Sequence, residues 1–169
     1  LGEEKECNNL KVDGSIPTEL DGIYVRTGPN PKDGKGSHWF LGDGMVHGIR
    51  LKKGKAEWYR NRFVQTPDIT EPLADPMAGL GDLRRGKGNT HVVAHNEQIM
   101  CLEEAHWPWT INADLETTGV LNYEGKLDCS MTAHPKICPI TGELLAFSYF
   151  SFEQPYLKYI RVSACLLYT

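Results

Sequence analysis

One histidine stands out because its neighbours would fix the direction of its side chain. His134 lies in the stretch Thr-Ala-His-Pro-Lys, directly before Pro135. A following proline biases a residue toward extended backbone and stiffens the chain after it. The imidazole of His134 would therefore project from a fixed position at a strand end, which suits a metal ligand. By itself, a histidine in such a place is also commonly an ordinary packed or exposed residue.

Two further histidines have a spacing that is typical of zinc ligands on a helix. His91 and His95 are four residues apart, but their surroundings, Asn89 to His95, read as a strand. On a strand, four residues span about 13 Å at ~3.3 Å per residue. These two side chains therefore cannot bind one ion between them.

Two glycine-containing loops resemble ligand sites only superficially. Residues 81–88 match the pattern G-x-x-x-x-G-K of a nucleotide-binding loop, but Gly88 stands where a magnesium-binding hydroxyl is needed, and a strand follows in place of a helix. Asp43, between two glycines and near His47, offers one carboxylate, which is too few oxygen ligands for a hard cation. Both segments are interpreted as loops, the second as a tight turn that leads into a strand.

The segments that must position these side chains read as short strands joined by turns. They are rich in β-branched and aromatic residues, and they alternate with a period closer to 2 than to 3.6. Turn residues such as Lys53-Gly54 and Asn96-Glu97 lie between them and predict hairpins. The expected strands are Ile23 to Thr27, Met45 to Leu51, Lys55 to Val64, Asn89 to His95, Gln98 to Glu103, Leu144 to Phe152 and Tyr156 to Val162.

Helical signals are weak, so the sequence predicts an all-β protein. Residues 71–84 contain Pro72, Pro76, Gly79 and Gly81, and any helix there would be short and broken. Many short strands at roughly 8–12-residue spacing suggest a sandwich, a barrel or a propeller. The hairpin order favours a propeller.

Composition narrows the class of protein further. The chain has 169 residues, with 18 basic and 22 acidic side chains and a net charge of −4. No basic run or stripe is long enough to follow a phosphate backbone, which argues against nucleic acid as a partner. The longest uncharged apolar run, residues 144–152, is far shorter than the roughly 20 residues that span a bilayer. Five cysteines without a C-x-x-C pair predict reduced thiols in a cytoplasmic protein.

Several segments, taken together and in order, resemble the carotenoid cleavage oxygenases, a family that includes apocarotenoid and lignostilbene dioxygenases. The resemblance covers almost the whole chain, roughly Leu10 to Val162. Small departures are Thr27 and Leu41, where the family more often has Asn and Asp. The segments that carry it are Ile16 to Pro17, Leu20 to Pro31, His38 to Gly48, Gly54 to Ala56, Tyr59 to Thr66, Asn89 to Thr90, Asp114 to Gly119, Thr132 to Lys136, Pro139 and Thr141 to Glu143.

The resemblance implies a fold and a metal. The family fold is a seven-bladed β-propeller with a non-haem Fe(II) on its axis, held by four histidines from different blades. His134 resembles the first of these four ligands. Glu104 resembles one of three glutamates that accept the outer N–H of ligating histidines, with Glu103 as the alternative if the register is shifted by one. In the family, the glutamate at this place orients a later histidine, so we expect its partner to lie beyond this chain.

The same resemblance implies that this chain is the N-terminal part of the propeller. No histidine follows His134, so three iron ligands are missing, and one imidazole cannot hold Fe(II) at useful affinity. We therefore expect residues 1–162 to form the leading blades, residues 163–169 to be a divergent or truncated tail, and the chain alone to be inactive. The alternatives are a non-enzymatic β-sheet interaction module, one half of a split enzyme, or, if the motif match were accidental, an unrelated sugar-binding propeller.

The expected partners of the parent enzyme follow from the family chemistry. It would split a C=C bond of a lipophilic polyene or stilbene with O₂ and give two carbonyl products. A membrane surface stays open as a partner, although no amphipathic stretch stands out in these residues.

Overall fold

Three four-stranded antiparallel sheets make up most of the chain in the computed structural model, which describes residues 2–34, 38, 40–151, 153–164 and 167–168. The first sheet has the order β1-β4-β3-β2 and contains β1 (Lys5–Asn8), β2 (Gly22–Pro29), β3 (Gly44–Lys52) and β4 (Lys55–Phe63). The second sheet runs in chain order and contains β5 (His91–His95), β6 (Gln98–Leu102), β7 (Trp109–Ile111) and β8 (Thr117–Val120). The third sheet also runs in chain order and contains β9 (Lys136–Ile137), β10 (Leu144–Ser148), β11 (Lys158–Val162) and β12 (Leu167–Tyr168).

The hairpins form where the sequence predicts them, because their turn residues accept a left-handed backbone. Lys53 and Gly54 have φ of 47° and 76°, and Asn96 and Glu97 have φ of 48° and 59°. Positive φ at both central residues is the type I′ pattern, whose twist matches that of the flanking strands. The seven expected strands are confirmed, with ends that differ by a few residues; Phe152, the expected end of one of them, lies outside the described residues.

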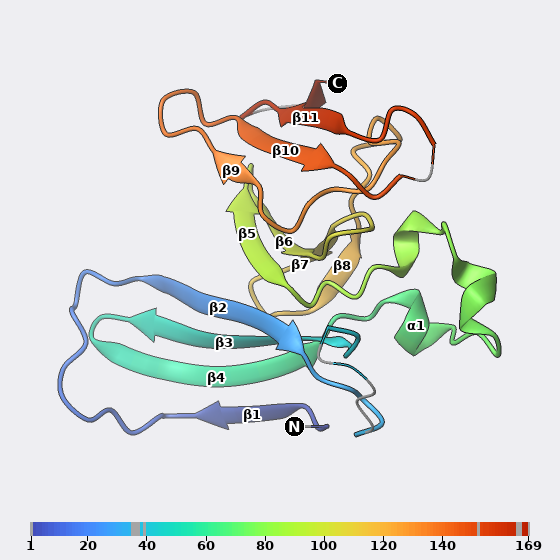
Figure 1. Ribbon diagram of the computed structural model, residues 1–169. Helices are drawn as coiled ribbons and strands as arrows, with labels where there is room; N and C mark the ends of the chain where they lie inside the picture. The colour runs from blue at the N-terminus through green and yellow to red at the C-terminus, as the bar shows by residue number, and fades with distance from the viewer. Residues whose placement is uncertain (1, 35–37, 39, 152, 165–166, 169) are drawn as a thin grey trace.

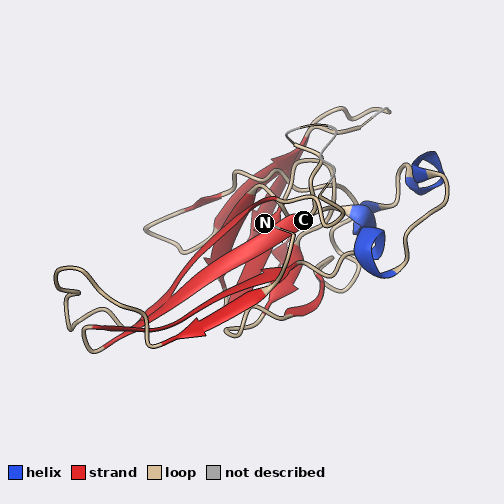
Figure 2. Ribbon diagram, turned by 90° about the horizontal axis from the view of Figure 1, so that it is seen from below, coloured by secondary structure: helices blue, strands red, loops and turns tan. Residues whose placement is uncertain are grey.

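The helical segments are short, as the prolines and glycines predict. They are α1 (Pro67–Thr70), η1 (Pro76–Gly79) and η2 (Leu83–Arg85), which Figure 2 shows together on one side of the strands. Within the described ranges, no helix has the length and apolar character needed to cross a membrane.

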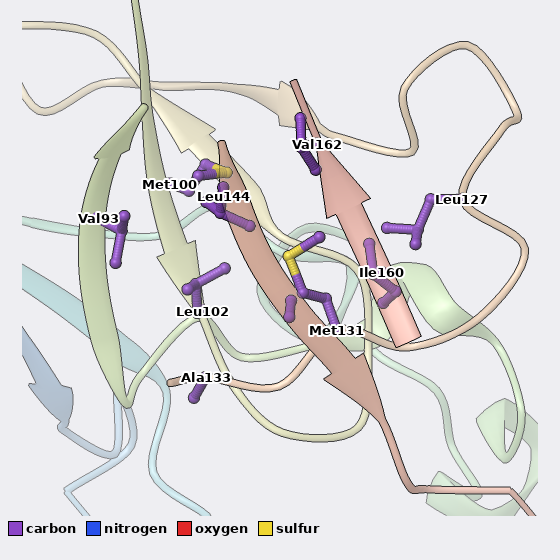
Figure 3. Packing of buried hydrophobic residues seen from close by; sticks show 10 residues of the cluster. Val93, Met100, Leu102, Leu127, Met131, Ala133, Leu144, Ile160 and Val162 are labelled. Atoms are coloured by element: carbon purple, nitrogen blue, oxygen red, sulfur yellow. The ribbon is translucent and has the colours of Figure 1, made fainter. Parts of the chain in front are cut away.

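Successive sheets pack face to face and bury two separate cores. Between the first and second sheets lie Val46, Val64, Cys101, Trp109, Ile111 and Leu115. Between the second and third sheets lie ten buried side chains, nine of which are labelled in Figure 3, around Met100, Met131 and Leu144. Because the middle sheet has a neighbour on each face, its two inner strands, β6 and β7, are largely buried. Figure 1 shows this stack of three sheets.

Four-stranded sheets that follow one another face to face are the blades of a propeller. The described residues form three such blades and do not close a ring, which agrees with the all-β, partial propeller expected from the sequence. Leu167 and Tyr168 add a short strand to β11, so part of the expected tail belongs to the third sheet. Residues 165, 166 and 169 of that tail lie outside the described residues.

Candidate metal centre

His134 is an exposed side chain on a buried segment between the second and third sheets. Thr132, Ala133 and Pro135 are buried, whereas 63% of the His134 side chain is exposed. The Thr132 N–H donates to the carbonyl of Phe147 at 2.9 Å, and the His134 N–H donates to the Thr132 hydroxyl at 3.2 Å. The backbone is therefore held in place while the imidazole reaches out of the segment, as the proline after it predicts.

Glu104, two residues after β6, binds this segment with both carboxylate oxygens. Its Oε1 lies 3.0 Å from Nε2 of His134. Its Oε2 accepts hydrogen bonds from the Thr132 hydroxyl at 3.0 Å and from the Ala133 N–H at 3.1 Å. A carboxylate beside one ring nitrogen favours a proton there and orients the ring. The contact with His134 is within this chain; that Glu104 serves a later histidine stays a prediction.

The neighbouring glutamate faces a different part of the molecule. Glu103 Oε1 lies 2.5 Å from Nδ1 of His106 and also accepts a hydrogen bond from the Ala105 N–H at 2.9 Å. Successive side chains at a strand end point to opposite faces, so only one of the two glutamates can reach the His134 segment. Of the two candidates, Glu104 is the one beside His134.

His91 also lies at this site, which sequence reasoning missed. Its Nδ1 is 2.8 Å from the carbonyl oxygen of Ala133, and its ring stacks on that of His134 with centroids 6.1 Å apart and planes inclined by 28°. His95, at the other end of β5, instead places Nε2 2.8 Å from the carbonyl oxygen of Gly142. The two histidines of the strand therefore serve different segments. No local sequence signal marks the pairing of His91 with His134, because it joins two sheets.

The two loops that superficially resemble ligand sites are held by ion pairs. Lys87 places Nζ 3.0 Å from Asp43 and 3.1 Å from Asp68. Asp43 also accepts a hydrogen bond from the Lys32 N–H at 3.0 Å. Residues 83–85 form a single 3₁₀ turn, and β5 follows shortly after. The basic and acidic side chains of both loops are thus engaged with one another, as expected of structural turns.

Two surface hollows lie away from His134. One of about 490 Å³ is lined by apolar side chains, including Phe40, Leu73 and Leu80, next to charged Arg85 and Lys87. Another of about 650 Å³ lies between the helical segments and the third sheet. Neither is lined by His134 or Glu104. The geometry therefore places the candidate ligand on an open face of the described blades.

The side chains of His134 and Glu104 could form one part of a metal site. Imidazole is a ligand that iron accepts, and a carboxylate behind it is the usual support of a ligating histidine. Among the described residues, no group of three or more His, Cys, Asp or Glu side chains could hold a metal ion. His134 and Glu104 therefore fit a single ligand with its supporting carboxylate.

The chain is similar to known proteins over almost its whole length. Residues 2–165 match the family described as RPE65, retinal pigment epithelial membrane protein. The chain is 42% identical to a carotenoid cleavage oxygenase of Mycobacterium tuberculosis over 88% of its length, and 36% identical to a carotenoid 9,10(9′,10′)-cleavage dioxygenase of Arabidopsis thaliana over 95%. It is 35% identical to resveratrol cleavage oxygenase 1 of Aspergillus fumigatus over 95%.

These curated relatives are longer, and the chain covers 31%, 36% and 36% of them respectively, about a third of their length. Among solved structures, the lignostilbene dioxygenase of Pseudomonas brassicacearum superimposes with a TM-score of 0.80 at 30% identity, over 98% of this chain and 39% of that one. A cobalt-substituted oxygenase of Synechocystis, at 23% identity and a TM-score of 0.77, shares the fold over 99% of this chain and 42% of that one. The family match, the identities and the shared fold show that this chain belongs to the carotenoid oxygenase family.

Proposed function

We propose that this chain supplies the leading blades and the first histidine ligand of an iron-dependent dioxygenase that cleaves C=C bonds of carotenoids, apocarotenoids or stilbenes. The observation that carries the proposal is the pairing of His134 with Glu104 at 3.0 Å on an otherwise buried segment. An exposed imidazole on a rigid backbone, with a carboxylate behind it, is how proteins present a metal ligand. The names of the relatives support the substrate class.

The proposed reaction consumes one C=C bond and one molecule of O₂. Each carbon of the double bond takes one oxygen atom, so the C=C and O–O bonds break and two carbonyl groups form. Bound Fe(II) would supply open coordination positions for O₂. This chain's own contribution is to hold the imidazole of His134 in a fixed direction, through Glu104 and the hydrogen bonds of Thr132 and Ala133.

The chain alone is proposed to be inactive. A single imidazole does not hold Fe(II) against water at useful affinity, and among the described residues no group of three or more His, Cys, Asp or Glu side chains could hold a metal ion. Further histidines would have to come from other blades.

A second candidate is that the chain acts through its outer sheet surface, either as one half of a split enzyme or as a non-enzymatic interaction module. The face of the third sheet that points away from the second carries exposed aromatic side chains. Phe147 and Tyr159 are paired across β10 and β11 and are 42% and 69% exposed. Apolar side chains gathered on an open sheet face favour contact with another sheet. A partner that carries the remaining blades would cover them.

A chimera tests the first proposal. Residues 1–162 would replace the matching part of the Mycobacterium tuberculosis relative, so that the later blades come from that protein. We expect the chimera to bind one iron and to cleave an apocarotenal or a stilbene under air, and the 169-residue chain to do neither. His134→Ala in the chimera should abolish iron binding, whereas His95→Ala should preserve it. Stoichiometric iron and cleavage by the 169-residue chain alone would refute the inactive-fragment proposal, and iron retained by the His134→Ala chimera would refute the ligand role.

A further inference from the structure

Two histidines of β5 tie the second sheet to the segments that precede and follow β9. Nδ1 of His91 lies 2.8 Å from the Ala133 carbonyl oxygen, and Nε2 of His95 lies 2.8 Å from the Gly142 carbonyl oxygen. A carbonyl oxygen only accepts hydrogen bonds, so each of these ring nitrogens must carry the proton. The two contacts have the same chemistry, but only the one made by His91 lies beside His134.

The hydrogen bond of His91 acts on the peptide unit that leads into His134. The Ala133 carbonyl and the His134 N–H belong to the same planar peptide group, so a bond that orients one also orients the other. The His134 N–H in turn donates to the Thr132 hydroxyl at 3.2 Å. On the other side, Pro135 restricts the backbone of His134. The direction in which the His134 side chain leaves the backbone is thereby restricted from both sides.

The ring of His91 also limits the side chain itself. Its centroid lies 6.1 Å from that of His134, with the planes inclined by 28°. Both residues are exposed, so water competes for these surfaces and the stacking can contribute only modestly. Together with Glu104 at Nε2, the His91 ring confines the imidazole of His134 on two sides.

We propose that His91 is a positioning residue for His134: its Nδ1–H orients the Ala133–His134 peptide group, and its ring limits the rotation of the His134 imidazole. The role is an addition to the support given by Glu104, and it rests on the proposed function in that His134 is the group to be presented to a metal. His91 itself is not a ligand in this proposal. A fixed ligand needs less ordering when the metal arrives, so its affinity is higher.

The first test uses the 169-residue chain without metal. The imidazole ¹⁵N spectrum at neutral pH should show His91 as the Nδ1–H tautomer. His91→Ala should speed amide hydrogen exchange at His134 about fivefold, the size of one modest hydrogen bond. His91→Asn, whose side-chain N–H can replace Nδ1–H, should restore exchange to within twofold of the unchanged chain. His95→Ala, which removes the matching histidine-to-carbonyl bond elsewhere on β5, should leave the His134 amide unaffected.

The second test adds Co(II) as the probe and follows the line broadening it causes. Broadening should centre on His134, disappear in His134→Ala, and require several-fold more Co(II) in His91→Ala than in His95→Ala. An Nε2–H tautomer at His91, unchanged His134 exchange in His91→Ala, or His91→Asn behaving like His91→Ala would overturn the positioning role. If His91→Ala does not fold, the tautomer and the His91→Asn variant still decide the matter. Broadening that centres on a residue other than His134 in the unchanged chain would instead count against the proposed function, which expects a single imidazole to bind the metal only weakly.

Discussion

Oε1 of Glu104 lies 3.0 Å from Nε2 of His134, although the glutamate follows a strand of the second sheet and the histidine precedes a strand of the third. The other oxygen of the same carboxylate accepts two hydrogen bonds from the His134 segment. One side chain thus joins two blades and faces the candidate ligand.

Replacing Glu104 should therefore weaken both the fold and the ligand segment. We expect Glu104→Ala to lower the free energy of unfolding by about 2 kcal/mol, because hydrogen bonds to a charged group are lost and the Ala133 N–H loses its acceptor. Glu104→Gln, which keeps an acceptor oxygen, should lose about half as much. Urea denaturation measures both. The control is Glu19→Ala, at an exposed position, which should change the free energy of unfolding by no more than about 0.5 kcal/mol. If Glu104→Ala changed it as little as this control does, the role of the carboxylate would be contradicted.

Lys87 should stabilise the fold up to alkaline pH. Burial alone would lower its pKa, but hydrogen bonds to Asp43 and Asp68 outweigh burial and raise the pKa above the ordinary value. A pKa raised by folding contributes stability that is complete below about pH 10.4 and is lost as the pH rises through the folded value. Lys87→Met should cost about 1–2 kcal/mol at pH 7, because two partly buried carboxylates lose a partner.

Urea titrations at pH 7 and pH 11 test this expectation. The difference in unfolding free energy between the unchanged chain and Lys87→Met should shrink at the higher pH. The exposed Lys126→Met serves as the control, since it should change stability little at either pH. A difference that is equal at both pH values would show that the ion pairs contribute nothing.

Asp82 should make stability sensitive to acid. The side-chain hydrogen bond from Arg84 has the largest effect on the pKa of the Asp82 carboxyl group. Burial alone would raise this pKa, but the hydrogen bond outweighs it and the pKa falls to about 2. A pKa depressed by folding contributes stability above about pH 4 that is lost as the pH falls toward about 2. After allowance for screening by solvent, we expect the ionised Asp82 to contribute about 1 kcal/mol to the free energy of unfolding.

Asp82→Asn isolates this charge effect, because asparagine can still accept the Arg84 N–H bond at the start of the 3₁₀ turn. Unfolding free energies at pH 6 and pH 2.5 should differ by about 1 kcal/mol less in the variant than in the unchanged chain. Identical pH dependence of the two proteins would rule out the depressed pKa as a source of stability.

Gly44 should tolerate no side chain. A Cβ atom there would collide with the carbonyl oxygen of Lys87 and lie 3.0 Å from the carbonyl carbon and oxygen of Gly88, and these backbone atoms cannot move aside cheaply. We expect Gly44→Ala to cost about 3 kcal/mol or to prevent folding. Gly22→Ala is the matched control on the neighbouring strand, because a Cβ at Gly22 has no atom within 4 Å. Thermal melting should give a clearly lower melting temperature for Gly44→Ala than for Gly22→Ala. Equal melting temperatures would contradict the close packing of Gly44 against the backbone of Lys87 and Gly88.

The cysteines should differ widely in reactivity. Burial raises the pKa of Cys101 to about 12, whereas hydrogen bonds involving Thr141 and Ile140 lower the pKa of Cys138 in its turn. Because the thiolate is the reactive form, iodoacetamide at pH 7.5 should modify Cys138 at least 100-fold faster than Cys101. Peptide mass spectrometry reads both rates. Denaturation in urea should bring the rates together, and a ratio near one in the folded chain would disprove the difference.

The local part of the fold could be predicted because short strands and type I′ turns are encoded by neighbouring residues. Met45 to Leu51 lies within β3 as expected, and Asn96-Glu97 marks a hairpin that the structure confirms. Trp109–Ile111 escaped prediction because all three residues are buried and no alternation marks so short a strand. Lys136–Ile137 has only two residues, so its strand is defined by its pairing with β10 and by nothing in its own sequence.

The sequence by itself determined an all-β chain, its family resemblance and the choice of His134, since residue types, spacing and the following proline are local properties. Tertiary structure decided which glutamate reaches that histidine and that His91 stacks on it. Both contacts join the second sheet, or the residues directly after its strand β6, to the segment that leads into the third sheet. Their formation depends on how the sheets pack through the cores between them, and packing of that kind is a property of the whole fold that no local pattern records.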